Sequence, residues 1–218
     1  MTRVQVSPNY ERRGEKVYRS GTDEEVGKWL KDAGVMVDVY EDQLSGWLFQ
    51  PAKLLRKENA ANAGFVLLTL ALSYIEGNQQ FREGKRSDEQ YGDGGSTGAF
   101  TRGCRRIFPA AKLQQDDWGA FFDKARCGAF HWTLLKPGVL INHDAPAAVR
   151  FDGAAFEVNP EKFLDAVERD FKAYVELLRS GSSDDRNRFL EFWDELETER
   201  PISTAFADCV PPGSGSAG

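Results

Sequence analysis

The longest apolar stretch of the chain lies in its first half and shows no alternation of apolar and polar residues. From Ala60 to Ile75 nearly every position is apolar. A half-buried strand would alternate, whereas an apolar run of this length favours a helix that is buried on most sides. We expect this helix to be the central member of a bundle.

Helical spacing also appears on the N-terminal side of this stretch. Over 37–57, apolar residues recur near the spacing of one helix face. Pro51 stands inside this segment. Because proline removes a backbone hydrogen bond and its ring crowds the preceding turn, we expect it to kink or split the helix.

Two further helices are predicted in the second half of the central region. The first runs over 99–112, and the second follows a cap at Asp116 and Asp117 and continues to about Phe130. Four glycines within 92–98 precede the first of them. They are followed by no GK[ST] and preceded by no strand, so we interpret them as a flexible connection, not a phosphate-binding loop.

The spacing of apolar residues then changes from that of helices to that of short strands, and after the strands it returns to that of helices. The stretches GVLINHD, AAVRF and AAFEV within 138–158 are β-branched or aromatic, and Asp152 and Gly153 mark a turn between the last two. A clean amphipathic helix follows, with Asn159 as its cap and Pro160 at its first position. Its apolar face consists of Phe163, Leu164, Val167, Phe171, Tyr174, Val175 and Leu178. A last helix is predicted over 185–199.

These patterns predict a mainly α fold, a bundle of about five to six helices with a small antiparallel β-hairpin or meander inserted near 138–158. The helical domain is expected over 37–200. Residues 1–36 are expected to form a polar arm, extended or partly disordered, with a short helix that ends at Gly34. Residues 201–218 are expected to be a disordered tail.

Composition and charge narrow the classes of function. The formal net charge is −6 and the pI is about 5.1, which argues against a generic nucleic-acid coat protein, although a small basic site remains compatible with an acidic body. Three cysteines form no CxxC pair and only two histidines are present, so we expect no structural zinc, no other metal and no cofactor. Free cysteines, the lack of a secretory h-region and the lack of a membrane-spanning run predict a soluble protein of the cytoplasm.

One of the two histidines follows an arginine by five residues. Arg126 and His131 belong to the stretch KARCGAFH at the end of the aromatic-rich helix, which we expect to finish by about Thr133. Five residues of an ideal helix correspond to about 7.5 Å of rise and about 140° of rotation, so the two side chains would not share a face. They converge only if the helix ends or loosens between them, and Gly128 is the residue most able to relax the backbone.

This stretch resembles the R-x(4–6)-H motif of the HEPN superfamily, and the earlier AGFVLLTLALSYIEG helix is similar to the buried helix of many members. The resemblance covers about 37–200, with its specific part in Arg126 and His131. It implies an all-α bundle and a metal-independent endoribonuclease of toxin–antitoxin, abortive-infection or CRISPR type. It also implies a homodimer that joins two copies of the motif in one cleft, and an antitoxin protein as a partner.

The implied chemistry suits the two side chains. An imidazole serves as acid or base near neutral pH, and a guanidinium grips phosphate oxygens in a bidentate fork. One histidine cannot conveniently act at both ends of the phosphate, which is why the resemblance implies that His131 of each copy faces a shared groove. The expected product is a 2′,3′-cyclic phosphate. The alternative is that His131 has a purely structural role, as a packed histidine that is hydrogen-bonded to a carbonyl.

Other side chains are candidates for supporting roles. Arg102, Arg105 and Arg106 share a helical face and could hold the RNA backbone, or they could simply form a solvated surface. Glu76 could orient Arg126, as acidic residues do in some HEPN proteins, or it could be a surface carboxylate.

Two residues with reactive side chains are assigned structural roles. His143 is expected to be a turn residue. Cys127 is expected to be a small buried hydrophobe, not a nucleophile. Phe and Trp residues at helical spacing are expected to belong to the core, not to a base-stacking platform.

Three hypotheses follow. The first is the metal-independent endoribonuclease. The second is a catalytically inactive HEPN-like binding or assembly module, which is favoured by the acidic charge and by Cys127, because the position after the arginine is usually polar in this superfamily. The third is an unrelated helical bundle in which the spacing of Arg126 and His131 is coincidental.

Overall fold

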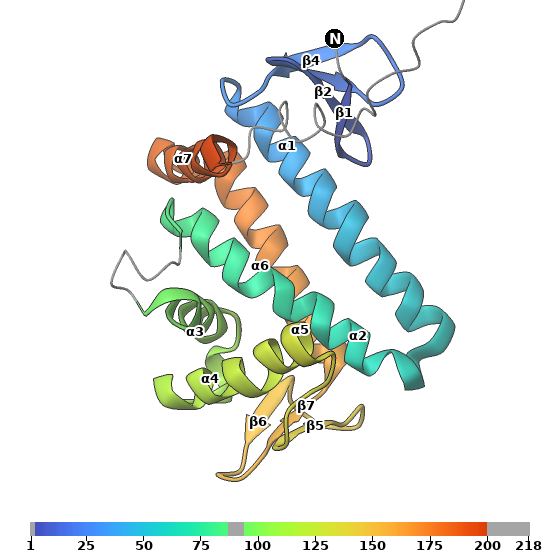
Figure 1. Ribbon diagram of the computed structural model, residues 1–218, viewed down its shortest axis with the longest axis vertical. Helices are drawn as coiled ribbons and strands as arrows, with labels where there is room; N and C mark the ends of the chain where they lie inside the picture. Colours follow the sequence, from blue (N-terminus) through green and yellow to red (C-terminus); the bar gives the residue numbers. More distant parts are fainter. Residues whose placement is uncertain (1–2, 87–93, 200–218) are drawn as a thin grey trace, which may run out of the picture.

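The computed structural model describes residues 3–86 and 94–199. It is mainly helical, with one small sheet near each end of a helical bundle (Figure 1). Predictions for 87–93 and for the tail 201–218 lie outside the described residues. Within the described ranges, no helix combines the length and the apolar character that a membrane span requires.

The N-terminal region is a sheet, so the prediction of a polar arm with a short helix is wrong. Four antiparallel strands follow one another in the order of the chain, namely β1 (Val4–Ser7), β2 (Tyr10–Arg13), β3 (Lys16–Arg19) and β4 (Glu25–Lys28). Each strand has four residues, which is too short to display a readable alternation. The buried side chains of Val6, Tyr10 and Val17 nevertheless form one apolar face of this sheet.

The first helix packs against this sheet and continues almost without interruption into the second. Helix α1 (Ala33–Leu44) begins at Asp32, whose carboxylate accepts a hydrogen bond from the amide of Val35. A π-helical stretch η1 (Ser45–Phe49) leads into α2 (Gln50–Glu83). Pro51 is the second residue of α2, and the residues just before it form the π-helical stretch. The helix continues through Pro51, so the prediction that this proline splits it is wrong.

Helix α2 is the central member of the bundle, as its apolar pattern predicts. Its neighbours are α3 (Gly95–Ile107), α6 (Pro160–Ser180) and α7 (Ser183–Glu199). The later part of α2 runs back alongside α1, because Asn78 and Phe81 of α2 both meet Tyr40 of α1 (Figure 1). Fully buried α2 side chains fill the centre of the core, namely Leu67, Leu68, Ala71, Leu72 and Ile75.

Helix α3 starts earlier than its apolar pattern predicts. Gly94 adopts a positive φ of 79° at the N-cap, and the glycine-rich residues from Gly95 onward form the first turns of the helix instead of a connection. A short 3₁₀ turn η3 (Pro109–Ala111) follows, and α4 (Gln115–Phe121) begins with a capping box between Gln114 and Asp117. The chain then continues through η4 (Phe122–Cys127) into α5 (Gly128–Trp132).

The second sheet is mixed, so the predicted antiparallel meander is only partly correct. Strands β6 (Val149–Phe151) and β7 (Phe156–Val158) form the expected hairpin, but β5 (Val139–Ile141) pairs in parallel on the other side of β7. The connection between β5 and β6 is held by Asn159, whose side-chain amide donates to the carbonyls of His143 and Ala145. The sequence pattern showed three short strands, but it did not show that the first of them pairs with the third.

The C-terminal helices follow the sequence pattern closely. Asn159 caps α6 by accepting from the amide of Lys162, and Pro160 occupies the first helical position. All seven residues predicted for its apolar face are buried. Helix α7 contributes Phe189 and Phe192 to the core, and Trp193 meets Trp29 after the N-terminal sheet at 5.6 Å between ring centroids.

Candidate functional site

Arg126 and His131 lie on one continuous helical segment whose middle is wound as a π-helix. Arg126 belongs to η4, and His131 belongs to the short helix α5 that follows. The backbone loosens at 122–127 and not at Gly128, which has ordinary helical angles of φ −56° and ψ −54°. The prediction about Gly128 is therefore wrong, although the segment does contain a wide turn of the kind that often marks functional sites.

Gly128 serves a different purpose, which is to let the returning chain approach the helix. A Cβ at this position would stand 2.7 Å from the carbonyl oxygen of Leu134 and 3.0 Å from the amide of Lys136. The helix ends at Thr133, as predicted, with a left-handed φ of 57°. The amide of Lys136 then donates to the carbonyl of Lys124 at 2.9 Å, which fixes the following loop alongside η4.

Arg126 is held in place from several sides. Its Nη2 donates to Oε2 of Glu76 on α2 at 2.9 Å. Its guanidinium carbon also lies 5.4 Å from the ring centroid of Phe122 and 5.0 Å from that of Phe130, so that the planar cation is flanked by two aromatic rings. About a quarter of the side chain, 25%, stays accessible to solvent. The predicted pairing of Glu76 with Arg126 is thus present in the structure.

His131 is exposed in the last turn of α5. This position contradicts the alternative of a packed histidine. In the described part of the chain no hydrogen bond joins His131 to Arg126, and the two side chains are linked through Phe130, which covers the guanidinium and immediately precedes the histidine. The same helical segment therefore carries one guanidinium that is held in place and one imidazole that is exposed to solvent.

The arginines predicted to contact RNA divide into two groups. Arg102 forms a two-pronged ion pair with Glu83, with distances of 2.7 and 2.9 Å. Arg106 donates to Asp170 and, at 3.3 Å, to Oε1 of Gln79. Both residues join α3 to its neighbours, whereas Arg105 is exposed. Contact with RNA stays a prediction, and it applies most directly to Arg105.

Two ion pairs and one hydrogen bond to a neutral amide place three arginines in a row along α2. Their partners Glu76, Gln79 and Glu83 are three and four residues apart, which is the spacing of one helix face. Arg126, Arg106 and Arg102 therefore follow one another over about 10 Å of the helix axis. Sequence reasoning named all three residues and Glu76, but it gave no sign that one face of α2 collects them.

His143 and the described cysteines have structural surroundings. Nδ1 of His143 lies 2.7 Å from Oε1 of Glu161, and the imidazole packs against the backbone of α2 at Gly64. Cys104 is fully buried, and burial raises the pKa of its thiol, which disfavours the reactive thiolate. Cys127 is a free thiol that packs against the core as predicted, but it is half-buried and not fully buried.

Sequence reasoning missed the exposed apolar residues around His131. Phe130 and Trp132, expected to belong to the core, are 44% and 64% exposed, and Leu134 and Leu140 nearby are also exposed. The signal was present in the sequence, since adjacent apolar residues at the end of a helix cannot all face one core. Because a large exposed apolar patch usually marks an interaction surface, this region extends the candidate site beyond Arg126 and His131.

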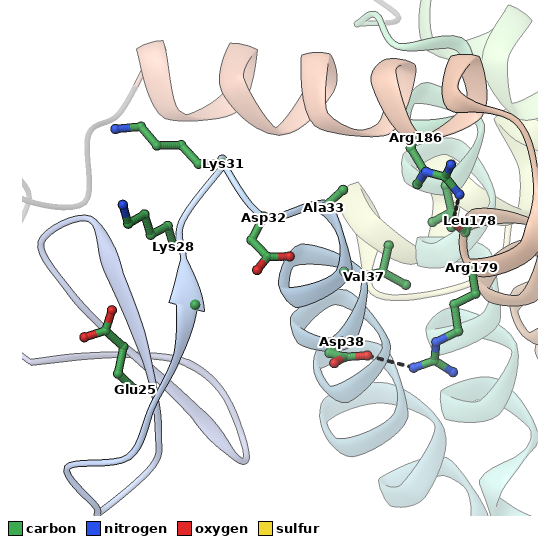
Figure 2. A pocket seen from close by; sticks show the side chains of 12 residues that line it. Glu25, Lys28, Lys31, Asp32, Ala33, Val37, Asp38, Leu178, Arg179 and Arg186 are labelled. Carbon is green, nitrogen blue, oxygen red and sulfur yellow. Dashed lines mark hydrogen bonds and ion pairs between the residues drawn. The ribbon is translucent and has the colours of Figure 1, made fainter.

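A separate cleft of about 750 Å³ lies at the other end of the bundle, between β4, the start of α1 and the α6–α7 corner. Figure 2 shows Lys28 and Lys31 on its strand side, and Arg179 and Arg186 on its helical side. Arg179 donates to Asp38 at 2.9 Å, and Arg186 donates to backbone carbonyls at the end of α6. Arg179 and Arg186 therefore stabilise the contacts between α1, α6 and the start of α7. None of the residues predicted for the functional site lines this cleft.

Among the described residues, no group of three or more His, Cys, Asp or Glu side chains is arranged so as to hold a metal ion. In comparisons with known proteins, no family model, curated protein or solved structure matches this chain. The case for a function therefore depends on the residues and their geometry.

Proposed function

We propose that this chain is a metal-independent endoribonuclease of a prokaryotic toxin or defence type, which cleaves RNA as a homodimer through Arg126 and His131. The observation that carries this proposal is the pairing of a fixed guanidinium with an exposed imidazole on one helical segment. The HEPN-like motif supplies the reaction class. The substrate and the proposed antitoxin partner would meet the protein in the cytoplasm.

In the proposed reaction, the ribose 2′-oxygen attacks phosphorus while the bond from phosphorus to the 5′-oxygen breaks. His131 of one copy removes the proton from the 2′-hydroxyl, and His131 of the second copy gives a proton to the leaving 5′-oxygen. The products are a 2′,3′-cyclic phosphate and a 5′-hydroxyl. Arg126 stabilises the negative charge that accumulates on the phosphate oxygens, a contribution that is often the largest in such reactions.

The surroundings of Arg126 are suited to this role. A guanidinium held by Glu76 and by two phenylalanine rings needs little ordering when it binds a phosphate, and its remaining N–H donors are available. The exposed apolar residues Phe130 and Leu134 beside His131 offer a surface through which a second copy can bring its own histidine close. A cleft formed in this way needs no contribution from the distant cavity of Figure 2.

The test is cleavage of labelled single-stranded RNA by the purified protein in the presence of EDTA. We expect cleavage by the wild-type chain, loss of cleavage in His131→Ala and retained cleavage in His143→Gln, a control in the only other histidine. Mass spectrometry of the products should find the cyclic phosphate, and light scattering should find a dimer. Cleavage that persists in His131→Ala, or that never appears in the wild type, rejects the proposal.

A second candidate is a catalytically inactive binding or assembly module of the same fold. One observation favours it, which is that Arg126 already has a carboxylate partner and is three-quarters shielded from solvent. In that case Arg126 stabilises the bundle, and the apolar surface around Trp132 binds another protein. A stable dimer without any RNA cleavage, and with unchanged assembly in His131→Ala, is the result that this alternative predicts.

A further inference from the structure

Trp132 is the most exposed large apolar side chain of the described residues, at 64%. The other tryptophans near the core have aromatic neighbours, since Trp29 packs on Trp193 and Trp118 stacks on Phe108. Exposure of an indole ring sacrifices the burial free energy that its large apolar area would provide. Because Trp132 is exposed and directly follows the proposed catalytic histidine in sequence, it is a candidate binding residue.

The backbone that carries Trp132 is rigidly held. The amides of Thr133 and Leu134 both point to the carbonyl of Gly128, and the loop that follows is tied to η4 through the bond from Lys136 to Lys124. The ring thus projects from the end of a fixed helix. A rigid aromatic side chain loses little conformational entropy on binding, which makes it an effective anchor.

The charge around this ring differs from that of the whole protein. The segment 122–138 contains three basic side chains, Lys124, Arg126 and Lys136, and a single carboxylate, Asp123, whereas the complete chain has a net charge of −6. Lys136 pairs with Asp123 at 2.7 Å and Arg126 pairs with Glu76 of α2 at 2.9 Å, which leaves Lys124 as the third cation of the segment. Sites for single-stranded nucleic acid usually combine basic groups along the path of the nucleic-acid backbone with an exposed aromatic ring on which a base stacks.

We propose that Trp132 stacks on a nucleobase of single-stranded RNA and so places the adjacent ribose at His131. This inference rests on the proposed endoribonuclease function and names its substrate class. Adjacent Cα atoms are about 3.8 Å apart, so the Trp132 and His131 side chains leave the helix within the span of about one nucleotide, in directions about 100° apart. Because every nucleobase has a π face, stacking on Trp132 would favour unpaired RNA over duplex without demanding one sequence.

Binding of a non-cleavable probe separates this inference from catalysis. The probe is a fluorescent 2′-O-methyl oligoadenine, which lacks the attacking hydroxyl, and its affinity is measured by anisotropy with the full chain. We expect Trp132→Ala to weaken binding by about 5-fold to about 100-fold, from the usual contribution of one stacked base. Trp132→Phe should retain most of the affinity. Trp47→Ala is the control, because Trp47 is also exposed, at 52%, but lies in η1 far along the chain.

An abasic nucleotide in the probe identifies stacking itself. A probe with its stacked base removed should bind the wild type as weakly as the intact probe binds Trp132→Ala, and the variant should not distinguish the two probes. Equal affinity of Trp132→Ala and wild type for the intact probe overturns the inference while leaving the proposed function standing if RNA is still cleaved. Conversion of Trp132→Ala to a monomer, with affinity restored at higher protein concentration, overturns it in favour of a contact between copies. If the wild type neither binds the probe nor cleaves RNA, both proposals are rejected.

Discussion

Arg126 and Glu76 are 50 positions apart in sequence, yet the guanidinium donates to the carboxylate at 2.9 Å and joins the motif-bearing segment to the central helix. Glu76 is only 12% exposed, so the pair is shielded well enough for its charges to interact more strongly than those of a surface pair. The orientation of Arg126 therefore depends on a residue of a different helix, and this dependence can be measured.

A double-mutant cycle tests the pair. We expect Arg126→Ala and Glu76→Ala each to lower the free energy of unfolding, and the double variant to lose less than the sum of the two. The coupling should be on the order of 1–2 kcal/mol, since each single change removes the Arg126–Glu76 contact from a partly buried charge. Urea denaturation of the four proteins provides the measurement. Strict additivity would show that the ion pair contributes nothing to stability.

Gly128→Ala should destabilise the protein, and Gly77→Ala should not. A methyl group at 128 meets backbone atoms of Leu134 and Lys136, which cannot move aside as a side chain can, so we expect a loss of about 1–3 kcal/mol. At Gly77, inside α2, a Cβ meets nothing within 4 Å, and alanine should gain up to about 1 kcal/mol through helix propensity. Thermal unfolding of both variants decides the matter, and equal melting temperatures would refute the packing argument.

The stability contributed by Glu83 should depend on pH. Burial acts to raise the pKa of Glu83, but hydrogen bonds from Arg102 and Gln79 outweigh burial and hold this pKa below its ordinary value of 4.5. A lowered folded-state pKa means that the stabilisation is complete above the unfolded-state pKa and is lost as pH falls through the folded-state value. Glu83→Gln should therefore cost about 1 kcal/mol near pH 7.

The matching measurement is urea denaturation of wild type and Glu83→Gln at a series of pH values. The difference in unfolding free energy should shrink as the pH falls below the unfolded-state pKa of a glutamate, about 4.3, because the unfolded chain then binds a proton that the folded carboxylate still excludes. A difference that stays constant down to pH 3 would mean that the charge of Glu83 plays no part.

Asp170 should be far more important for stability than another aspartate of the same helix. Its carboxylate receives Arg106 and Arg82, and also accepts the hydroxyl of Tyr74 at 2.9 Å. Asp170→Ala leaves two shielded guanidinium groups without their carboxylate, which should cost about 3–5 kcal/mol. Asp165→Ala is the control, because Asp165 and its partner Arg56 are both 41% exposed. That change should cost at most about 1 kcal/mol. Similar melting temperatures for the two variants would contradict the assignment.

The sequence pattern predicted the helices best where apolar residues recur over several turns. Helix α6 is the clearest case, since its cap at Asn159, its first residue Pro160 and its whole apolar face agree with the prediction. The N-terminal sheet could not be predicted in the same way. Strands of four residues give too few alternations, and their stability comes from pairing with one another and from burial of Val6, Tyr10 and Val17 in the core.

For the candidate site, local sequence determined that Arg126 and His131 occupy one helical segment that finishes at Thr133, because helix periodicity and helix ends are encoded within a few residues. Phe122 and Phe130 stand four residues before and four residues after Arg126, so their contacts with the guanidinium also follow from helix spacing. Only the tertiary structure decided that Glu76 fixes Arg126, and that Phe130 and Trp132 face solvent. The position of Glu76 next to Arg126 depends on how α2 packs against η4, and local sequence does not determine how helices that are distant along the chain pack together.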